Sequence, residues 1–182
     1  MTAPAASTQV IVLNGGSSSG KSTIARELQE ILPGAWLTFG VDSFIEALPP
    51  SLADGGALEI RPDGEIVVRE EFRTLEAAWI AGVGAMVRAG ARIILDEAFL
   101  GQDTSQARWR DGLRGLTVLW AGVRCAPEVA AQREAGRPDR IPGMAGKQAD
   151  LVHIGVAYDV EVDTTSTGAR EAALAIAARV LG

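Results

Sequence analysis

The chain has one cysteine, no long apolar run and fewer basic than acidic residues, and each scarcity excludes a class of protein. Cys125 is the only cysteine among 182 residues, so an intrachain disulfide or a cysteine-rich zinc site cannot form, and we expect a reducing, cytoplasmic environment. No stretch approaches the roughly 18 consecutive apolar residues of a membrane span, so we expect no membrane partner. Basic residues are outnumbered, 17 Lys and Arg against 23 Asp and Glu, which argues against nucleic acid as a partner because binding to its phosphates needs clustered cations.

What remains is an ordinary globular composition. Hydrophobic residues make up 47% of the chain and charged residues 22%, and the length suits a single domain with a sizeable core. We therefore predict one domain over residues 1–182. Its first eight residues are small and polar and predict a flexible N-terminus. The sequence does not indicate an oligomeric state.

A glycine-rich motif near the N-terminus is the most informative feature. It reads Gly15-Gly16-Ser17-Ser18-Ser19-Gly20-Lys21-Ser22 and satisfies the pattern G-x-x-x-x-G-K-[ST] of a loop that surrounds nucleotide phosphates. Such a loop points successive backbone N–H groups at an anion, its lysine reaches the β- and γ-phosphates, and its serine hydroxyl binds Mg²⁺. A chance Gly/Ser-rich turn is the alternative, but an apolar run at 9–13 precedes the motif and a helical pattern at 22–28 follows it. We predict nucleotide binding by residues 15–23, Thr23 included.

Strand-like and helical segments alternate along the whole chain. The expected strands are 9–13, 36–39, 92–97, 117–123 and 159–162. The expected helices include 70–89, 104–113, 127–135, 145–152 and 169–181, and residues 58–68 read as a hairpin within a surface excursion over 49–69. Alternation of this kind predicts an α/β fold of the P-loop NTPase class, with a parallel five-stranded sheet covered by helices on both faces.

Acidic residues follow two of these strands, at the edge where ligands of parallel sheets bind. Asp96 ends an apolar run and is the candidate to hold Mg²⁺ together with Ser22, although strands also end in aspartate for turns and caps. Glu97 either shares this role or is a solvated neighbour. Asp42 lies in the expected exit loop 40–43 and is the candidate base that orients an acceptor hydroxyl and takes its proton; the alternative is a cap of a short helix at 43–47.

Three arginines lie in or beside a loop at 136–143 that glycine and proline interrupt. Arg133, Arg137 and Arg140 are expected to come over the phosphates when this loop closes as a lid, with a solvated charged loop as the alternative. His153 reads as a capping or surface histidine and Cys125 as a small buried side chain. Some of the aromatic residues Phe39, Phe44, Trp79 and Phe99 are candidates for an apolar substrate wall.

These stretches together resemble the chloramphenicol 3-O-phosphotransferase family. The resemblance runs from about Val10 to the C-terminal helix, and its more specific parts are Phe39-Gly40-Val41-Asp42-Ser43 and Tyr158-Asp159-Val160-Glu161-Val162-Asp163-Thr164-Thr165. It implies a fold similar to nucleoside monophosphate kinases, with Asp42 at the position of the catalytic base and Arg137 and Arg140 at the positions of the lid arginines.

The resemblance also implies an activity. We expect an ATP- and Mg²⁺-dependent kinase that phosphorylates a hydroxyl of chloramphenicol or a close natural product and so inactivates it. The sequence departs from the family at Ser19, at the Asp96–Glu97 pair and over 49–69. We expect this last segment to border the acceptor, so the alternative acceptor is another hydroxylated antibiotic or a small metabolite. A nucleotide-binding switch without acceptor phosphorylation is the alternative of another class.

Overall fold

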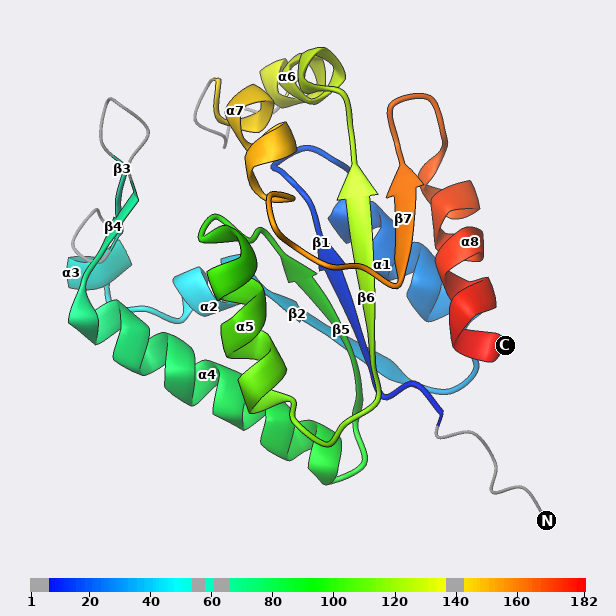
Figure 1. The fold of residues 1–182 in the computed structure, drawn as a ribbon, viewed down its shortest axis with the longest axis horizontal. Helices are drawn as coiled ribbons and strands as arrows, with labels where there is room; N and C mark the ends of the chain where they lie inside the picture. The colour runs from blue at the N-terminus through cyan, green and yellow to red at the C-terminus, as the bar shows by residue number, and fades with distance from the viewer. Residues whose placement is uncertain (1–6, 54–57, 61–65, 137–142) are drawn as a thin grey trace.

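The protein folds around a parallel sheet, as the alternation of segments predicts. The computed structural model describes residues 7–53, 58–60, 66–136 and 143–182, and between 53 and 67 it describes the backbone alone (Figure 1). The large sheet has the order β2-β5-β1-β6-β7, and all four of its pairings are parallel. Its strands are β1 (Val10–Asn14), β2 (Trp36–Gly40), β5 (Arg92–Glu97), β6 (Val118–Arg124) and β7 (Val160–Asp163).

Helices cover both faces of this sheet. Those described are α1 (Lys21–Ile31), α2 (Val41–Glu46), α3 (Pro50–Ala53), α4 (Glu70–Arg88), α5 (Gln102–Gly112), α6 (Pro127–Ala135), α7 (Met144–Leu151) and α8 (Ala169–Leu181). On one face α1 and α8 pack against alternate residues of β1, including Ile11 and Leu13. On the other face α4 and α5 pack against the remaining residues, including Val10 and Val12. All five residues of β1 are buried, which explains why that strand reads as a continuous apolar run.

The expected hairpin is present as a separate small sheet. Strands β3 (Leu58–Ile60) and β4 (Ile66–Val68) pair with each other in antiparallel register. Figure 1 shows this pair beyond the N-terminal end of α4, away from the five-stranded sheet. The excursion 49–69 is therefore an insertion between α2 and α4.

Three expectations fall at least partly outside the described residues, one of them the excursion 49–69, which is described except at 54–57 and 61–65. The N-terminal stretch 1–8 is described only from residue 7 onward, and the lid 136–143 only at its two ends, so Arg137 and Arg140 are not described. Among the described helices none has both the length and the apolar character needed to cross a membrane.

Candidate active site

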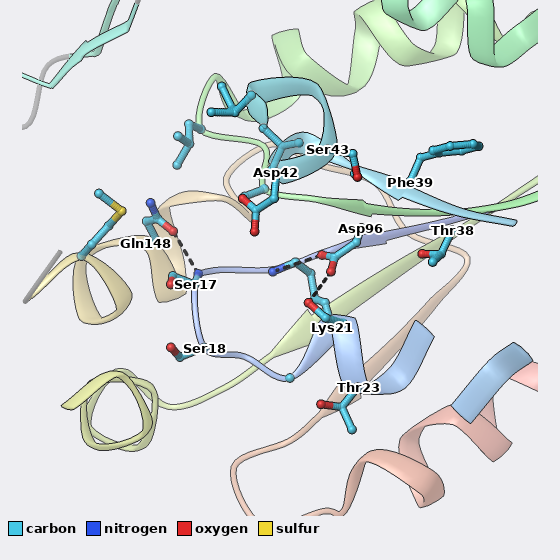
Figure 2. Close-up of a pocket in the computed structure, with 18 of the residues that line it drawn as sticks. Ser17, Ser18, Lys21, Thr23, Thr38, Phe39, Asp42, Ser43, Asp96 and Gln148 are labelled. Atoms are coloured by element: carbon cyan, nitrogen blue, oxygen red, sulfur yellow. Dashed lines mark hydrogen bonds and ion pairs between the residues drawn. The ribbon is translucent and has the colours of Figure 1, made fainter. Parts of the chain in front are cut away.

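The motif 15–22 forms the loop between β1 and α1 and the first two residues of α1, at the carboxyl edge of the sheet. Gly20 adopts φ +93°, a left-handed conformation that suits glycine, and Ser18 adopts φ +58°. These torsions turn the chain so that α1 begins at Lys21 with its N-terminus at the loop (Figure 2). The Lys21 ammonium is buried and donates a hydrogen bond to the Gly16 carbonyl oxygen at 2.9 Å. The loop thus combines a helix N-terminus with a held cation, an arrangement suited to bound phosphate.

A carboxylate from the neighbouring strand meets this loop. Strand β5 pairs with β1 so that Asp96 stands beside Leu13, two residues before the motif begins. The Ser22 hydroxyl donates to Asp96 Oδ2 at 2.6 Å, and Lys21 Nζ lies 3.7 Å from Asp96 Oδ1. Ser22 and Asp96 present the hard oxygen ligands that Mg²⁺ prefers, and Mg²⁺ sites commonly use one or two carboxylates together with substrate phosphates. The described residues contain no cluster of three or more His, Cys, Asp or Glu side chains that could hold a metal by itself.

Asp42 lies at the same edge, but in a helix and not in the expected exit loop. Helix α2 begins directly after β2, at Val41, and places Asp42 in its first turn, where the helix dipole favours a negative charge. The preceding Gly40 stands opposite Asp96 in the β2–β5 register. A Cβ added to Gly40 would stand 2.2 Å from the Asp96 carbonyl oxygen, so only glycine allows β2 to run this close to β5. This close approach brings Asp42 toward Asp96.

One cavity of about 410 Å³ joins these groups. Figure 2 shows Asp42 on the opposite side of this cavity from the start of α1, with Asp96 between them. The cavity is lined by Ser17, Ser18, Gly20, Lys21, Ser22, Thr23, Arg26, Thr38, Phe39, Gly40, Val41, Asp42, Ser43, Ile45, Asp96, Ala98, Leu100, Met144 and Gln148. Of the four aromatic candidates only Phe39 lines it. Phe44 and Phe99 are buried in hydrophobic clusters, and Trp79 packs edge-on against Phe39 with ring centroids 6.0 Å apart.

Other predicted site residues lie behind or beside the cavity. Gly15, Gly16 and Ser19 do not line it, and the Ser19 carbonyl oxygen accepts a hydrogen bond from the Thr164 hydroxyl at 2.7 Å. The Arg133 guanidinium donates to the Thr164 carbonyl oxygen at 2.7 Å and does not line the cavity either. The structure therefore places Arg133 against the segment that follows β7, and its role over the phosphates stays a prediction.

Comparison with known proteins identifies the family. The model of the chloramphenicol phosphotransferase-like proteins matches residues 8–181. The chain belongs to that family. A relative from Mycobacterium tuberculosis strain H37Rv, named "Putative O-phosphotransferase", is 30% identical over 192 residues, which cover 91% of this chain and 79% of the relative.

Solved structures similar to this family member have kinase folds. A sugar kinase from Janibacter sp. matches with TM-score 0.69 and 21% identity, covering 96% of this chain and 94% of the kinase. A Deinococcus radiodurans tunicamycin resistance protein matches with TM-score 0.65 and 22% identity, covering 95% of each chain. Shikimate kinase from Acinetobacter baumannii matches with TM-score 0.57 and 19% identity, covering 96% and 93%. These matches confirm the predicted P-loop kinase fold, and with the family they support a small-molecule phosphotransferase.

The sequence did not indicate one feature of this chloramphenicol phosphotransferase-like protein: a buried hydrogen-bond network that lies beneath the phosphate loop. Asn14, which ends β1, donates to the Val152 carbonyl oxygen at 2.8 Å and to the Tyr158 hydroxyl at 2.5 Å, and its Oδ1 accepts the Phe99 N–H at 2.8 Å. The Tyr158 hydroxyl lies 2.6 Å from His153 Nδ1. The position of Asn14 immediately before the first glycine of the motif was the one available signal.

The expectation for His153 was wrong. This histidine is only 7% exposed, because the segment after α7 folds back under the phosphate loop and packs it against Tyr158. Desolvation by burial, with a smaller effect of Arg124, lowers the pKa of His153 to about 4. Desolvation also raises the pKa of Tyr158 to about 12. Both groups are therefore neutral near pH 7, and Asn14 and His153 bind an uncharged phenol.

Glu97 is not a solvated neighbour of Asp96. Successive residues of a strand point to opposite faces, so Asp96 points toward the cavity and Glu97 toward α4 and α5, where it is 7% exposed. Desolvation by burial, followed by repulsion from Asp96 and Glu76, raises the pKa of Glu97 to about 8. Glu97 does not line the cavity. Asp96 therefore belongs to the site, whereas Glu97 is buried in the core.

Proposed function

We propose that the protein is an ATP- and Mg²⁺-dependent O-phosphotransferase that phosphorylates a hydroxyl of chloramphenicol or a close natural product and so inactivates the compound. One observation carries the proposal: Asp42 opens into the same cavity as Lys21 of the phosphate loop and the Ser22–Asp96 pair. Family membership and the relative named as an O-phosphotransferase support a hydroxyl as the acceptor.

Each residue of the site would have a role in phosphoryl transfer that follows from its chemistry. The N–H groups of the phosphate loop and Lys21 would hold the phosphates and offset their charge. Ser22 and Asp96 would hold Mg²⁺, which neutralises charge on the phosphate oxygens when it is bound. Asp42 would accept a hydrogen bond from the acceptor hydroxyl, orient the oxygen for attack and take its proton. Arg137 and Arg140 are proposed to close over the phosphates from the lid.

The acceptor is the part of the proposal with an open alternative. The wall at Phe39, Ile45 and Leu100 suits an acceptor with an apolar body. The inserted segment 49–69 follows α2, which carries Asp42, so changes in this segment can select another hydroxylated antibiotic or a small metabolite. A structural neighbour named as a tunicamycin resistance protein makes such antibiotics reasonable members of a substrate panel.

The deciding experiment measures ATP consumption by the purified protein with Mg²⁺, with and without chloramphenicol, and identifies the product by mass. Turnover that depends on chloramphenicol, with one phosphoryl group added to the drug, is the expected result. Turnover with another hydroxylated compound but not with chloramphenicol would keep the phosphotransferase and replace its substrate. Slow hydrolysis that no acceptor stimulates would favour the nucleotide-dependent switch.

A further inference from the structure

Gln148 is a buried polar residue of the cavity to which sequence reasoning gave no role. It lies on α7, is 8% exposed, and its Oε1 accepts the backbone N–H of Ser17 at 2.9 Å. Because a backbone N–H can only donate, this contact fixes which end of the side-chain amide faces the loop. The NH₂ group, which carries two donors, therefore faces away from Ser17, and Figure 2 shows it on the side of Gln148 away from Ser17.

The helix that carries Gln148 is held at both ends. At its start the buried carboxylate of Glu134 accepts the N–H groups of Gly143 at 2.7 Å and Ala145 at 2.8 Å. Beyond its end Asn14 donates to the Val152 carbonyl oxygen. Between these points α7 rests on the phosphate loop, because a Cβ added to Gly16 would stand 3.1 Å from backbone atoms of α7. The position of the Gln148 amide is thus set by the scaffold before any substrate binds.

The surroundings of this amide decide what it would bind. Ser17 belongs to the loop that would hold the phosphates, and Asp42, the proposed base, lines the same cavity. In the proposed reaction the transferred phosphoryl group must pass between the phosphate loop and Asp42. Donors fixed in advance beside that path stabilise anionic oxygens at little reorganisation cost.

We infer that Gln148 is a catalytic residue whose side-chain NH₂ donates a hydrogen bond to a non-bridging oxygen of the terminal phosphoryl group. The inference rests on the proposed phosphoryl transfer. It assigns the two ends of one amide to two tasks: the carbonyl oxygen holds the first turn of the phosphate loop, and the nitrogen recognises the phosphoryl group that leaves ATP. The γ-phosphoryl group is then distinguished from the phosphates that ADP retains.

The test compares the binding of Mg·ADP with that of Mg·AMPPNP, a non-hydrolysable analogue that carries all three phosphates, by isothermal titration calorimetry. Gln148→Leu removes both contacts of the amide, so it should weaken both nucleotides through the loop and raise the Kd of AMPPNP about tenfold more than the Kd of ADP, the effect of losing one hydrogen bond to a charged oxygen. Gln148→Glu keeps the acceptor for Ser17 and the side-chain size but replaces the donors by a carboxylate oxygen. It should weaken AMPPNP at least as much.

The control is Lys147→Gln, an exposed neighbour on the same helix that does not line the cavity, for which both Kd values should stay at the wild-type level. Equal weakening of ADP and AMPPNP by both Gln148 variants would show that Gln148 only shapes the loop, and unchanged binding would show that it has no part in recognition. Either result overturns the inference. The binding assay needs no acceptor, so a failure to phosphorylate chloramphenicol would count against the proposed function alone.

Discussion

Replacing Gly40 by alanine should separate phosphoryl transfer from nucleotide binding. The φ of Gly40 is −171°, an extended conformation open to any residue. The effect of the substitution therefore comes from steric overlap of the new Cβ and not from backbone strain. The new Cβ would stand 2.2 Å from the Asp96 carbonyl oxygen and 3.1 Å from Asp96 Cβ, whereas real Cβ contacts essentially never fall below 3.0 Å. Both neighbours belong to a central strand, so the end of β2 must give way.

The expected displacement is about 1 Å, and a misplacement of that size near reacting groups can lower a rate about 100-fold. Asp42 follows Gly40 by two residues and would move with it, so kcat for the acceptor should fall by about that factor. The overpacking should cost about 1–3 kcal/mol, which for a chain of this length lowers Tm by about 2–12 °C. Binding of Mg·ADP should be unchanged, because the phosphate loop is connected to β1 and α1, neither of which has to move when the end of β2 is displaced.

The assays are steady-state turnover, calorimetric ADP binding and thermal unfolding. Gly82→Ala is the matched control, because a Cβ at Gly82 would meet no atom within 4 Å apart from its chain neighbours and its own helix backbone. Alanine in a helix interior should stabilise the protein by about 0.5–1 kcal/mol without changing kcat. Wild-type kcat and wild-type Tm in Gly40→Ala would refute the reasoning that this glycine sets the position of Asp42.

Four further outcomes are expected. Asp42→Asn should lower kcat by about 10²–10⁴ in a turnover assay while ATP still binds, whereas Glu46→Gln, at the other end of α2, should leave kcat unchanged. Lys21→Ala should weaken calorimetric ATP binding and lower kcat together, because the ammonium would contact the phosphates in both states. Tyr158→Phe should leave the acceptor nitrogen of His153 without a partner and lower the unfolding free energy by about 1–3 kcal/mol in urea titrations. The pKa of His153 is lowered in the folded state, so stability should fall as pH drops from 6.5 toward 4, and the fall should be shallower in His153→Gln.

Most of the fold could be predicted because the longer strands and helices carry their own periodic signals. The short helices α2 and α3, of six and four residues, carry none: α2 was expected only as the alternative over 43–47, and α3 was not expected. The continuous apolar run of β1 reflects a strand that is buried on both faces, and the apolar stripe of α4 reflects a helix that is buried on one face. The helices expected at 127–135 and 169–181 have the bounds observed for α6 and α8. The motif 15–22 likewise needs only local sequence. Its context of strand, loop and helix follows from the same signals.

The residues that were misplaced depend on contacts between distant segments. His153 was assigned from its position near a helix end, but the structure packs it against Tyr158, whose hydroxyl is also bound by Asn14, more than a hundred residues earlier in the chain. The split between Asp96 and Glu97 required knowing which face of β5 each helix covers. Gln148 could not be recognised because nothing local indicates that α7 rests on the phosphate loop.

The hairpin β3–β4 has a consequence for how such enzymes diversify. It forms its own two-stranded sheet and shares no strand pairing with the five-stranded sheet among the described residues. Substitutions or length changes there would leave the register of the large sheet, and with it the position of the phosphate loop at the end of β1, unchanged. Under the proposed function, remodelling this segment would change the acceptor while the phosphate loop keeps its place at the end of β1.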